Sequence, residues 1–91
     1  MIVRSALGLA LLAAAAQTAS DSEQLQQHRN LGKAFYENPA TQYEAVGELQ
    51  KALVLAPDSA RERVNYGLAL LRAGQAEKGI AELERAQKQD P

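Results

Sequence analysis

Asn-Tyr-Gly-Leu-Ala-Leu, at residues 65–70, decides how the rest of this 91-residue chain is interpreted. A related run, Asn-Leu-Gly-Lys-Ala-Phe, lies 35 positions earlier, at residues 30–35. The two runs share the asparagine, the glycine and the alanine, and both carry large apolar residues at the second and last places. A segment that returns with its small and large apolar residues in phase predicts a structural repeat.

The match continues toward the C-terminus with an offset of 34. The matched pairs are Val46 and Ile80, Leu49 and Leu83, Ala52 and Ala86, and Pro57 and Pro91. Spacings of three and four residues between apolar positions indicate helices, since such residues share one helix face. The change of offset gives the first unit one extra residue, which we expect in the turn at residues 38–40, because loops tolerate insertions.

Two glycines fall inside the predicted helices, Gly32 and Gly67. Glycine costs a helix about 1 kcal/mol relative to alanine, so a compensating contact is expected. The recurrence of the glycine in the same apolar surroundings favours close helix packing over a neutral surface position. We expect the paired helix to leave no room for a Cβ, with Ala45 and Gly79 as the small residues on the facing helices.

These motifs resemble the tetratricopeptide repeat family. The resemblance covers two repeats, residues 23–57 and 58–91, and the second follows the pattern more closely, with Gly67 and Pro91 in register. It implies an all-α fold of two stacked antiparallel helix-turn-helix hairpins, which is a fragment of an α-solenoid. Two such units predict a marginal core, because solenoid repeats bury their apolar faces on neighbours and about three are usually needed.

Helix boundaries follow from capping and breaking residues. The predicted helices run from about Ser22 to Glu37, from Thr41 to the residue before Pro57, from Asp58 or Ser59 to Gly74, and from about Ala76 to Gln89. Capping boxes are expected where a Ser or Thr precedes a Glu by three residues: Ser20 with Glu23, Thr41 with Glu44, and Ser59 with Glu62. Pro39 ends the first helix at Asn38, and Gly74 is expected to close the third in the left-handed conformation.

The apolar faces of these helices form the candidate core. The predicted core residues are Leu25, Leu31, Ala34 and Phe35 in the first helix, and Tyr43, Ala45, Val46, Leu49, Ala52, Leu53 and Leu55 in the second. The third contributes Val64, Tyr66, Leu68, Ala69, Leu70 and Leu71, and the fourth Ile80, Leu83 and Ala86.

Residues 1–16 are predicted to be a signal peptide. Arg4 supplies a positive n-region, residues 6–16 are a short apolar stretch, and the alanines at residues 14–16 satisfy the rule for cleavage near Ala16. The apolar stretch is shorter than the about 20 residues of a membrane span. Residues 17–22 are then a polar linker, and the mature chain is expected in the periplasm or secreted, without a stable membrane span. The alternatives are an uncleaved signal anchor that tethers the chain to a membrane, and an ordinary apolar helix of the fold.

Composition excludes several classes of function. The net charge is −1 and few residues are aromatic, so nothing indicates nucleic-acid binding. The chain has no cysteine, which excludes disulfides, zinc–thiolate sites and a cysteine nucleophile. His28 is the one histidine and is expected to be solvated or half-packed. No phosphate-binding glycine loop is present. We therefore predict no enzyme, no metal site and no cofactor.

The resemblance also implies a binding surface, because in that family the first helix of each repeat lines a concave groove. It places nine residues there: Gln26, Arg29, Asn30, Lys33, Arg61, Val64, Asn65, Leu68 and Arg72. The peptide-binding set that we select is Arg29, Asn30, Lys33, Arg61, Asn65, Leu68 and Arg72. Asn30 and Asn65 match the asparagine that hydrogen-bonds the backbone or terminal carboxylate of a peptide. A solvated charged face and plain repeat consensus are the alternative explanations.

The sequence therefore predicts an exported scaffold that binds a protein or peptide through this groove, as the N-terminal part of a larger protein. The excess of basic residues favours an acidic partner or one with a free C-terminal carboxylate. One alternative is a structural spacer or oligomerisation module without a separate ligand, which completes its core by self-association. Another is a regulatory appendage of a downstream enzyme.

Overall fold

The computed structural model describes residues 2–90, and the side chains of residues 20–90. The elements in order are α1 (Ile2–Glu37), η1 (Pro39–Thr41), α2 (Gln42–Leu55), α3 (Ala60–Arg72) and α4 (Ala76–Gln89). No strand occurs within residues 2–90, which confirms the predicted all-α class.

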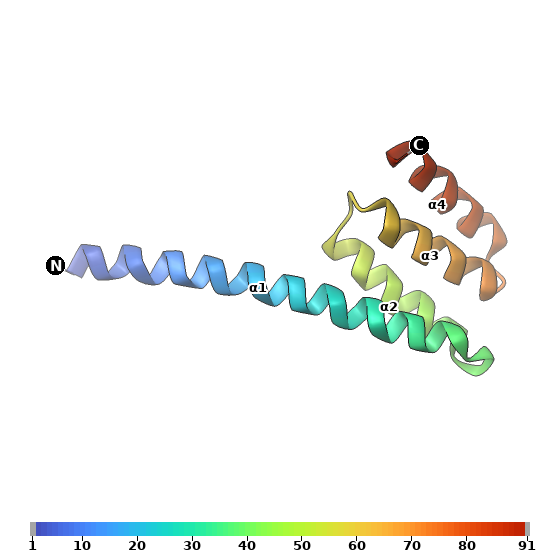
Figure 1. The fold of residues 1–91 in the computed structure, drawn as a ribbon, viewed down its shortest axis with the longest axis horizontal. Coiled ribbons are helices and arrows are strands. Elements are labelled where there is room, and N and C mark those ends of the chain that lie inside the picture. Colours follow the sequence, from blue (N-terminus) through green and yellow to red (C-terminus); the bar gives the residue numbers. More distant parts are fainter. Residues whose placement is uncertain (1, 91) are drawn as a thin grey trace.

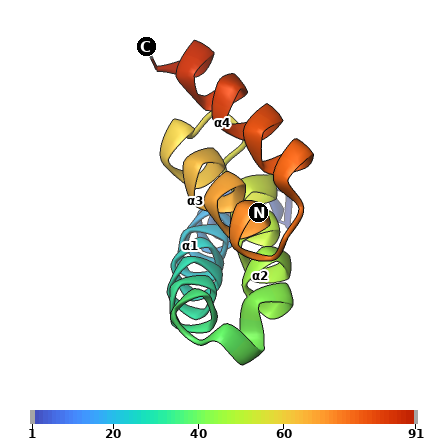
Figure 2. The same cartoon turned by 90° about the vertical axis from the view of Figure 1, so that its right-hand side faces the viewer.

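The helices form two stacked antiparallel hairpins (Figure 1). α1 and α2 make the first hairpin, joined by the short 3-10 helix η1, and α3 and α4 make the second. α3 packs mainly on α2, so that the first hairpin lies at one end of the stack and α4 at the other (Figures 1 and 2). The structure thus confirms the two stacked antiparallel hairpins that the repeated sequence pattern predicts.

The first helix begins much earlier than predicted. α1 starts at Ile2 and continues without a break through residues 17–22, which were expected to be a linker. Nothing in that stretch forbids a helix, because it has neither proline nor glycine, and a potential capping residue such as Ser20 only favours a helix start. Figure 1 shows the N-terminal half of α1 extending away from the hairpins. Within the part of the chain whose side chains are described, no helix is long and apolar enough to cross a membrane.

The turn between α1 and α2 corrects a second prediction. Thr41 precedes α2, but its side chain accepts no capping hydrogen bond, so the predicted capping box with Glu44 does not form. The Thr41 hydroxyl instead donates to the carbonyl oxygen of Phe35 at 2.7 Å. This carbonyl lies in the last turn of α1 and also accepts from the N–H of Asn38 at 3.3 Å. Asn38 accepts from the N–H of Ala40 at 2.9 Å, and this bond shapes the turn that holds the extra residue.

Both ends of α3 are capped, although only half of the predicted capping box of Ser59 with Glu62 forms, because the N–H of Ser59 binds the carbonyl of Ala56. The Ser59 hydroxyl accepts from the N–H of Glu62 at 3.2 Å, although the Glu62 carboxylate points elsewhere. At the other end Gly74 has φ +84°, the left-handed conformation that glycine adopts without strain. The N–H of Gly74 binds the carbonyl of Leu71 and the N–H of Gln75 that of Leu70, which is the Schellman pattern.

The buried glycines explain how closely the helices approach. A Cβ on Gly32 would lie 2.5 Å from the side chain of Leu49. A Cβ on Gly67 would lie 2.9 Å from Leu83, the repeat counterpart of Leu49, and 3.1 Å from the carbonyl oxygen of Gly79. The prediction that these glycines leave no room for a side chain is confirmed. Gly79 is the small residue that faces Gly67, whereas Leu49 supplies the nearest atoms at Gly32.

The core lies between the hairpins. Ala45, Leu49 and Ala69 form its buried centre, and four half-buried side chains pack against them: Phe35, Tyr36, Val46 and Tyr66. Several predicted core residues are exposed instead: Leu31, Ala34, Tyr43, Val64, Leu68, Leu71 and Ile80. These residues satisfy the helical spacing, but no neighbour within residues 20–90 covers them.

A contact between a basic side chain and a glutamate recurs at the same place in both hairpins. His28 Nδ1 lies 2.6 Å from Glu48 Oε2, and Arg63 Nη1 lies 2.7 Å from Glu82 Oε2. Residues 28 and 63 differ by 35 and residues 48 and 82 by 34, so the pairs are repeat equivalents. Each pair joins the two helices of its hairpin. His28 is half-buried, as predicted.

Candidate functional site

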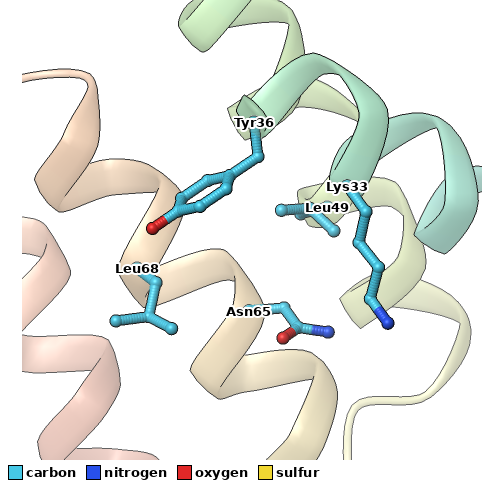
Figure 3. A pocket seen from close by; sticks show the side chains of 5 residues that line it. All are labelled: Lys33, Tyr36, Leu49, Asn65 and Leu68. Carbon is cyan, nitrogen blue, oxygen red and sulfur yellow. The ribbon is translucent and has the colours of Figure 1, made fainter. Parts of the chain in front are cut away.

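A pocket of about 200 Å³ opens where α1, α2 and α3 meet. Its lining residues are Lys33, Tyr36, Leu49, Asn65 and Leu68 (Figure 3). Lys33 and Tyr36 are three residues apart on α1, and Asn65 and Leu68 are three apart on α3, so each pair shares a helix face. Leu49 of α2 is 2% exposed and closes the inner end of the pocket.

The pocket has a polar side and an apolar side. Figure 3 shows the side chains of Lys33 and Asn65 on one side, and those of Tyr36 and Leu68 on the other. None of the five lining side chains is acidic. The polar groups of Lys33 and of the Asn65 Nδ2 are donors, so this side suits a carboxylate or a peptide carbonyl.

Asn65 carries the most informative polar group of the pocket. Its Nδ2 is buried and has no hydrogen-bond partner within the described part of the chain. A buried donor without a partner costs about 1–3 kcal/mol, and an acceptor that enters the pocket would recover this cost. Asn65 was predicted from the repeat pattern, but the sequence does not reveal that its Nδ2 lacks a partner among the described residues.

Arg72 contacts the tyrosine of the apolar side. Its guanidinium carbon lies 4.5 Å from the centroid of the Tyr36 ring. This is the geometry of a cation–π contact, which is worth about 0.5–1 kcal/mol at an exposed site. The contact fixes the aromatic wall of the pocket and keeps a positive charge beside it.

Arg29 binds a buried carboxylate of the protein itself. Its Nε donates to Glu62 Oε1 at 2.7 Å, and its Nη2 binds the same oxygen. The Glu62 side chain is fully buried, and its other oxygen, Oε2, has no partner within the described residues. Arg29 therefore neutralises a buried carboxylate between the hairpins, and much less of its charge is available to a ligand than the sequence prediction assumed.

The remaining predicted site residues lie apart from this pocket. Arg61 is exposed and lines a shallow groove between α3 and α4, together with Val64 and Asp90. Asn30 is exposed on α1 and lines none of the described pockets. The structure thus brings Lys33, Asn65 and Leu68 together, and their role in binding a peptide stays a prediction.

Sequence reasoning missed Tyr36, Leu49 and Glu62 as parts of this region. Tyr36 could have been found, because it lies three residues after Lys33 on the same helix face. Glu62 carries a weaker signal: it lies seven residues before Ala69, so it shares the buried face of α3 although it was assigned only to a helix cap. Leu49 was predicted as core, and it serves as both core and pocket wall.

A second, wider groove lies between α1 and α2. Its lining residues are Gln24, His28, Gln50, Lys51, Val54 and Leu55. The hydrogen bond from His28 is the main cause that lowers the pKa of Glu48 below its ordinary value, while burial opposes this and Lys51 adds to it. The charges here compensate one another, whereas those of the first pocket do not.

Comparison with known proteins adds no relative to these observations. No protein-family model, no curated protein and no solved structure matches the chain. The geometry of the pocket therefore carries the functional argument.

Proposed function

We propose that the chain is an exported helical-repeat scaffold that binds an extended protein segment through the pocket lined by Lys33, Asn65 and Leu68. The segment is acidic or ends in a free carboxylate. The single observation that carries this proposal is the buried Asn65 Nδ2, a donor without a partner among the described residues, in a pocket that Lys33 also lines. An apolar side chain of the segment would rest against Leu68 and Tyr36.

Each part of the pocket has a distinct role in this proposal. Lys33 and Arg72 are exposed, so their charges act mainly on the rate of association and are screened over about 8 Å at physiological salt. Asn65 is half-buried, so its hydrogen bond acts mainly on the rate of dissociation. The resemblance to tetratricopeptide repeats and the composition of residues 1–16 support the scaffold role and the export.

The test uses pools of short acidic peptides with either a free or an amidated C-terminus, with binding measured by fluorescence anisotropy. Asn65→Ala should weaken binding by about 5–100-fold, the equivalent of about 1–3 kcal/mol. Lys33→Glu should slow association and reduce its dependence on salt, while Lys78→Glu, an exposed lysine on α4, should change neither. Asn30→Ala should have little effect, because Asn30 lies outside the pocket.

Two results would contradict the proposal. One is that no peptide pool binds the parent chain. The other is that Asn65→Ala and Lys33→Glu bind the same peptides with unchanged affinity, which would favour the spacer that binds no separate ligand.

A further inference from the structure

The contact between the two hairpins provides a template for a contact that the structure leaves open. In this contact α3 lies on α1 and α2. α3 contributes Glu62, which binds Arg29, and Ala69, which is 1% exposed. Tyr66 of α3 packs against the same buried cluster. The first hairpin contributes Arg29, Val46 and Leu49.

The outer side of α1 carries the repeat counterparts of the α3 residues. Counting 35 back from Glu62, Tyr66 and Ala69 gives Gln27, Leu31 and Ala34, which we name the leading face. All three are exposed, and Leu31 retains 47% of its surface. The leading face therefore presents the pattern with which α3 docks, but nothing in the described residues covers it.

The outer side of the second hairpin carries the counterparts of the surface that receives α3. Arg29, Val46 and Leu49 correspond to Val64, Ile80 and Leu83, which we name the trailing face. Leu49 is 2% exposed in the covered contact, whereas its counterpart Leu83 is half-buried, and Ile80 retains 50% and Val64 36% of their surface. The first hairpin and α4 lie at opposite ends of the stack (Figures 1 and 2), so the two faces point away from each other.

The two open faces both lack the charged residue that their counterparts carry in the contact between the hairpins. Inside the chain a basic residue, Arg29, meets the buried carboxylate of Glu62. At the corresponding places of the two open faces stand Val64 and Gln27, both uncharged. A second α3-like helix on the trailing face would bury its carboxylate against Val64 without a partner, which is strongly unfavourable. The leading face brings the neutral Gln27 to that position, so it is the better occupant.

We propose that copies of this chain associate head to tail, the leading face of one copy docking on the trailing face of the next. The occupant of the open apolar surface is thus a second copy of the chain. Because the two faces differ, the contact is heterologous, and association continues beyond the dimer into linear or closed stacks. The proposal does not depend on the pocket between the hairpins of one copy, although Asn65 lines both that pocket and the groove that contains Val64 and Leu83.

The first experiment blocks one face at a time and measures the mass of the full chain by sedimentation equilibrium. The parent should grow beyond a dimer as its concentration rises toward about 1 mM. Leu31→Glu blocks the leading face and Ile80→Glu the trailing face, and each should weaken self-association at least about tenfold. An equimolar mixture of the two variants should form a mixed dimer and nothing larger, because each variant keeps only one functional face. Circular dichroism verifies the helix content, which these exposed positions should leave unchanged.

The matched control is Val54→Glu. Val54 is 72% exposed on α2, and its repeat counterpart, Lys88, is exposed on α4. It introduces the same charge at an exposed aliphatic residue outside both faces, and should associate like the parent. The control and both variants retain the apolar N-terminus. Association through that segment would therefore persist equally in all three chains, which distinguishes it from association through the two faces.

The second experiment tests the register of the contact. Val64→Arg is introduced into a chain whose leading face is blocked by Leu31→Glu, and Gln27→Glu into a chain blocked by Ile80→Glu, so that only one contact can form. Val64→Arg against the unchanged Gln27 should weaken the mixed dimer at least about tenfold, and Gln27→Glu should restore it by recreating the Arg29–Glu62 pair between copies.

Three results would overturn the proposal. The parent could remain a monomer at about 1 mM. Leu31→Glu alone could still form a dimer, which would indicate a symmetric contact between two trailing faces. Finally, Gln27→Glu could fail to restore the mixed dimer, which would show that the register is wrong.

Discussion

The sharpest test of the packing is a pair of glycine-to-alanine substitutions, Gly79→Ala and Gly47→Ala. Both glycines lie inside helices, so each substitution should gain about 1 kcal/mol of helix propensity. A Cβ on Gly79 would lie 2.8 Å from the carbonyl oxygen of Gly67 and 2.9 Å from the side chain of Leu71, whereas a Cβ on Gly47 meets nothing within 4 Å. Because the closest atom belongs to the backbone, the helices must separate.

The difference between the two variants isolates the packing contribution. Overpacking costs about 1–3 kcal/mol, so Gly79→Ala should be about 1–3 kcal/mol less stable than Gly47→Ala, and Gly47→Ala more stable than the parent. In a domain of this size each 1 kcal/mol shifts the midpoint by about 4–8 °C. Thermal unfolding followed by circular dichroism measures both midpoints. Equal midpoints would refute the conclusion that α3 and α4 touch through these glycines.

The remaining predictions concern charge and processing. Arg29→Ala should destabilise the chain by about 3–5 kcal/mol, since it leaves the Glu62 carboxylate buried without its cation. Arg29→Met combined with Glu62→Leu should lose far less, and urea unfolding of both variants checks this; equal losses would contradict it. His28→Ala should raise the pKa of Glu48 toward its ordinary value, because the hydrogen bond from His28 is the main cause of the lowered pKa. The stability that the parent gains from this lowered pKa should be fully present above the unfolded-state pKa of Glu48. It should be lost as the pH falls through the lowered folded-state pKa. A carboxyl NMR titration measures the pKa, and an unchanged value would refute the assignment. Mass spectrometry of protein exported from a bacterial host should show a chain without residues 1–16, whereas an intact N-terminus in the membrane fraction would support the signal anchor.

What repeats in the sequence was predictable, because two copies of a pattern confirm one another. The close packing at Gly32 and Gly67 followed from that repetition. The cap at Ser59 and the left-handed Gly74 do not recur, and they followed from the local preferences of serine and glycine at helix ends. The exposed Ile80 shows the limit of this reasoning, since spacing identifies a face but not whether a neighbour covers it.

What occurs once in the chain was not predictable in the same way. The Arg29–Glu62 pair has no counterpart, because Val64 and Gln27 stand at the equivalent places, and two residues 33 apart give no local signal. The Thr41 hydroxyl binds a carbonyl of the preceding helix instead of capping the following one. Which of these two hydrogen bonds forms depends on the geometry of the turn. The unpaired amide of Asn65 depends on its burial, which only the assembled hairpins define.

The buried carboxylate of Glu62 limits how such a chain could be lengthened by duplication. If residues 58–91 alone were repeated in tandem, the new copy of Glu62 would meet Val64 and lose its cation, at a cost of about 3–5 kcal/mol. If both hairpins, residues 23–91, were repeated together, Gln27 would take that place and every Glu62 would keep its Arg29. The module that can be copied without penalty is therefore the pair of hairpins, and one ion pair makes the two halves non-interchangeable.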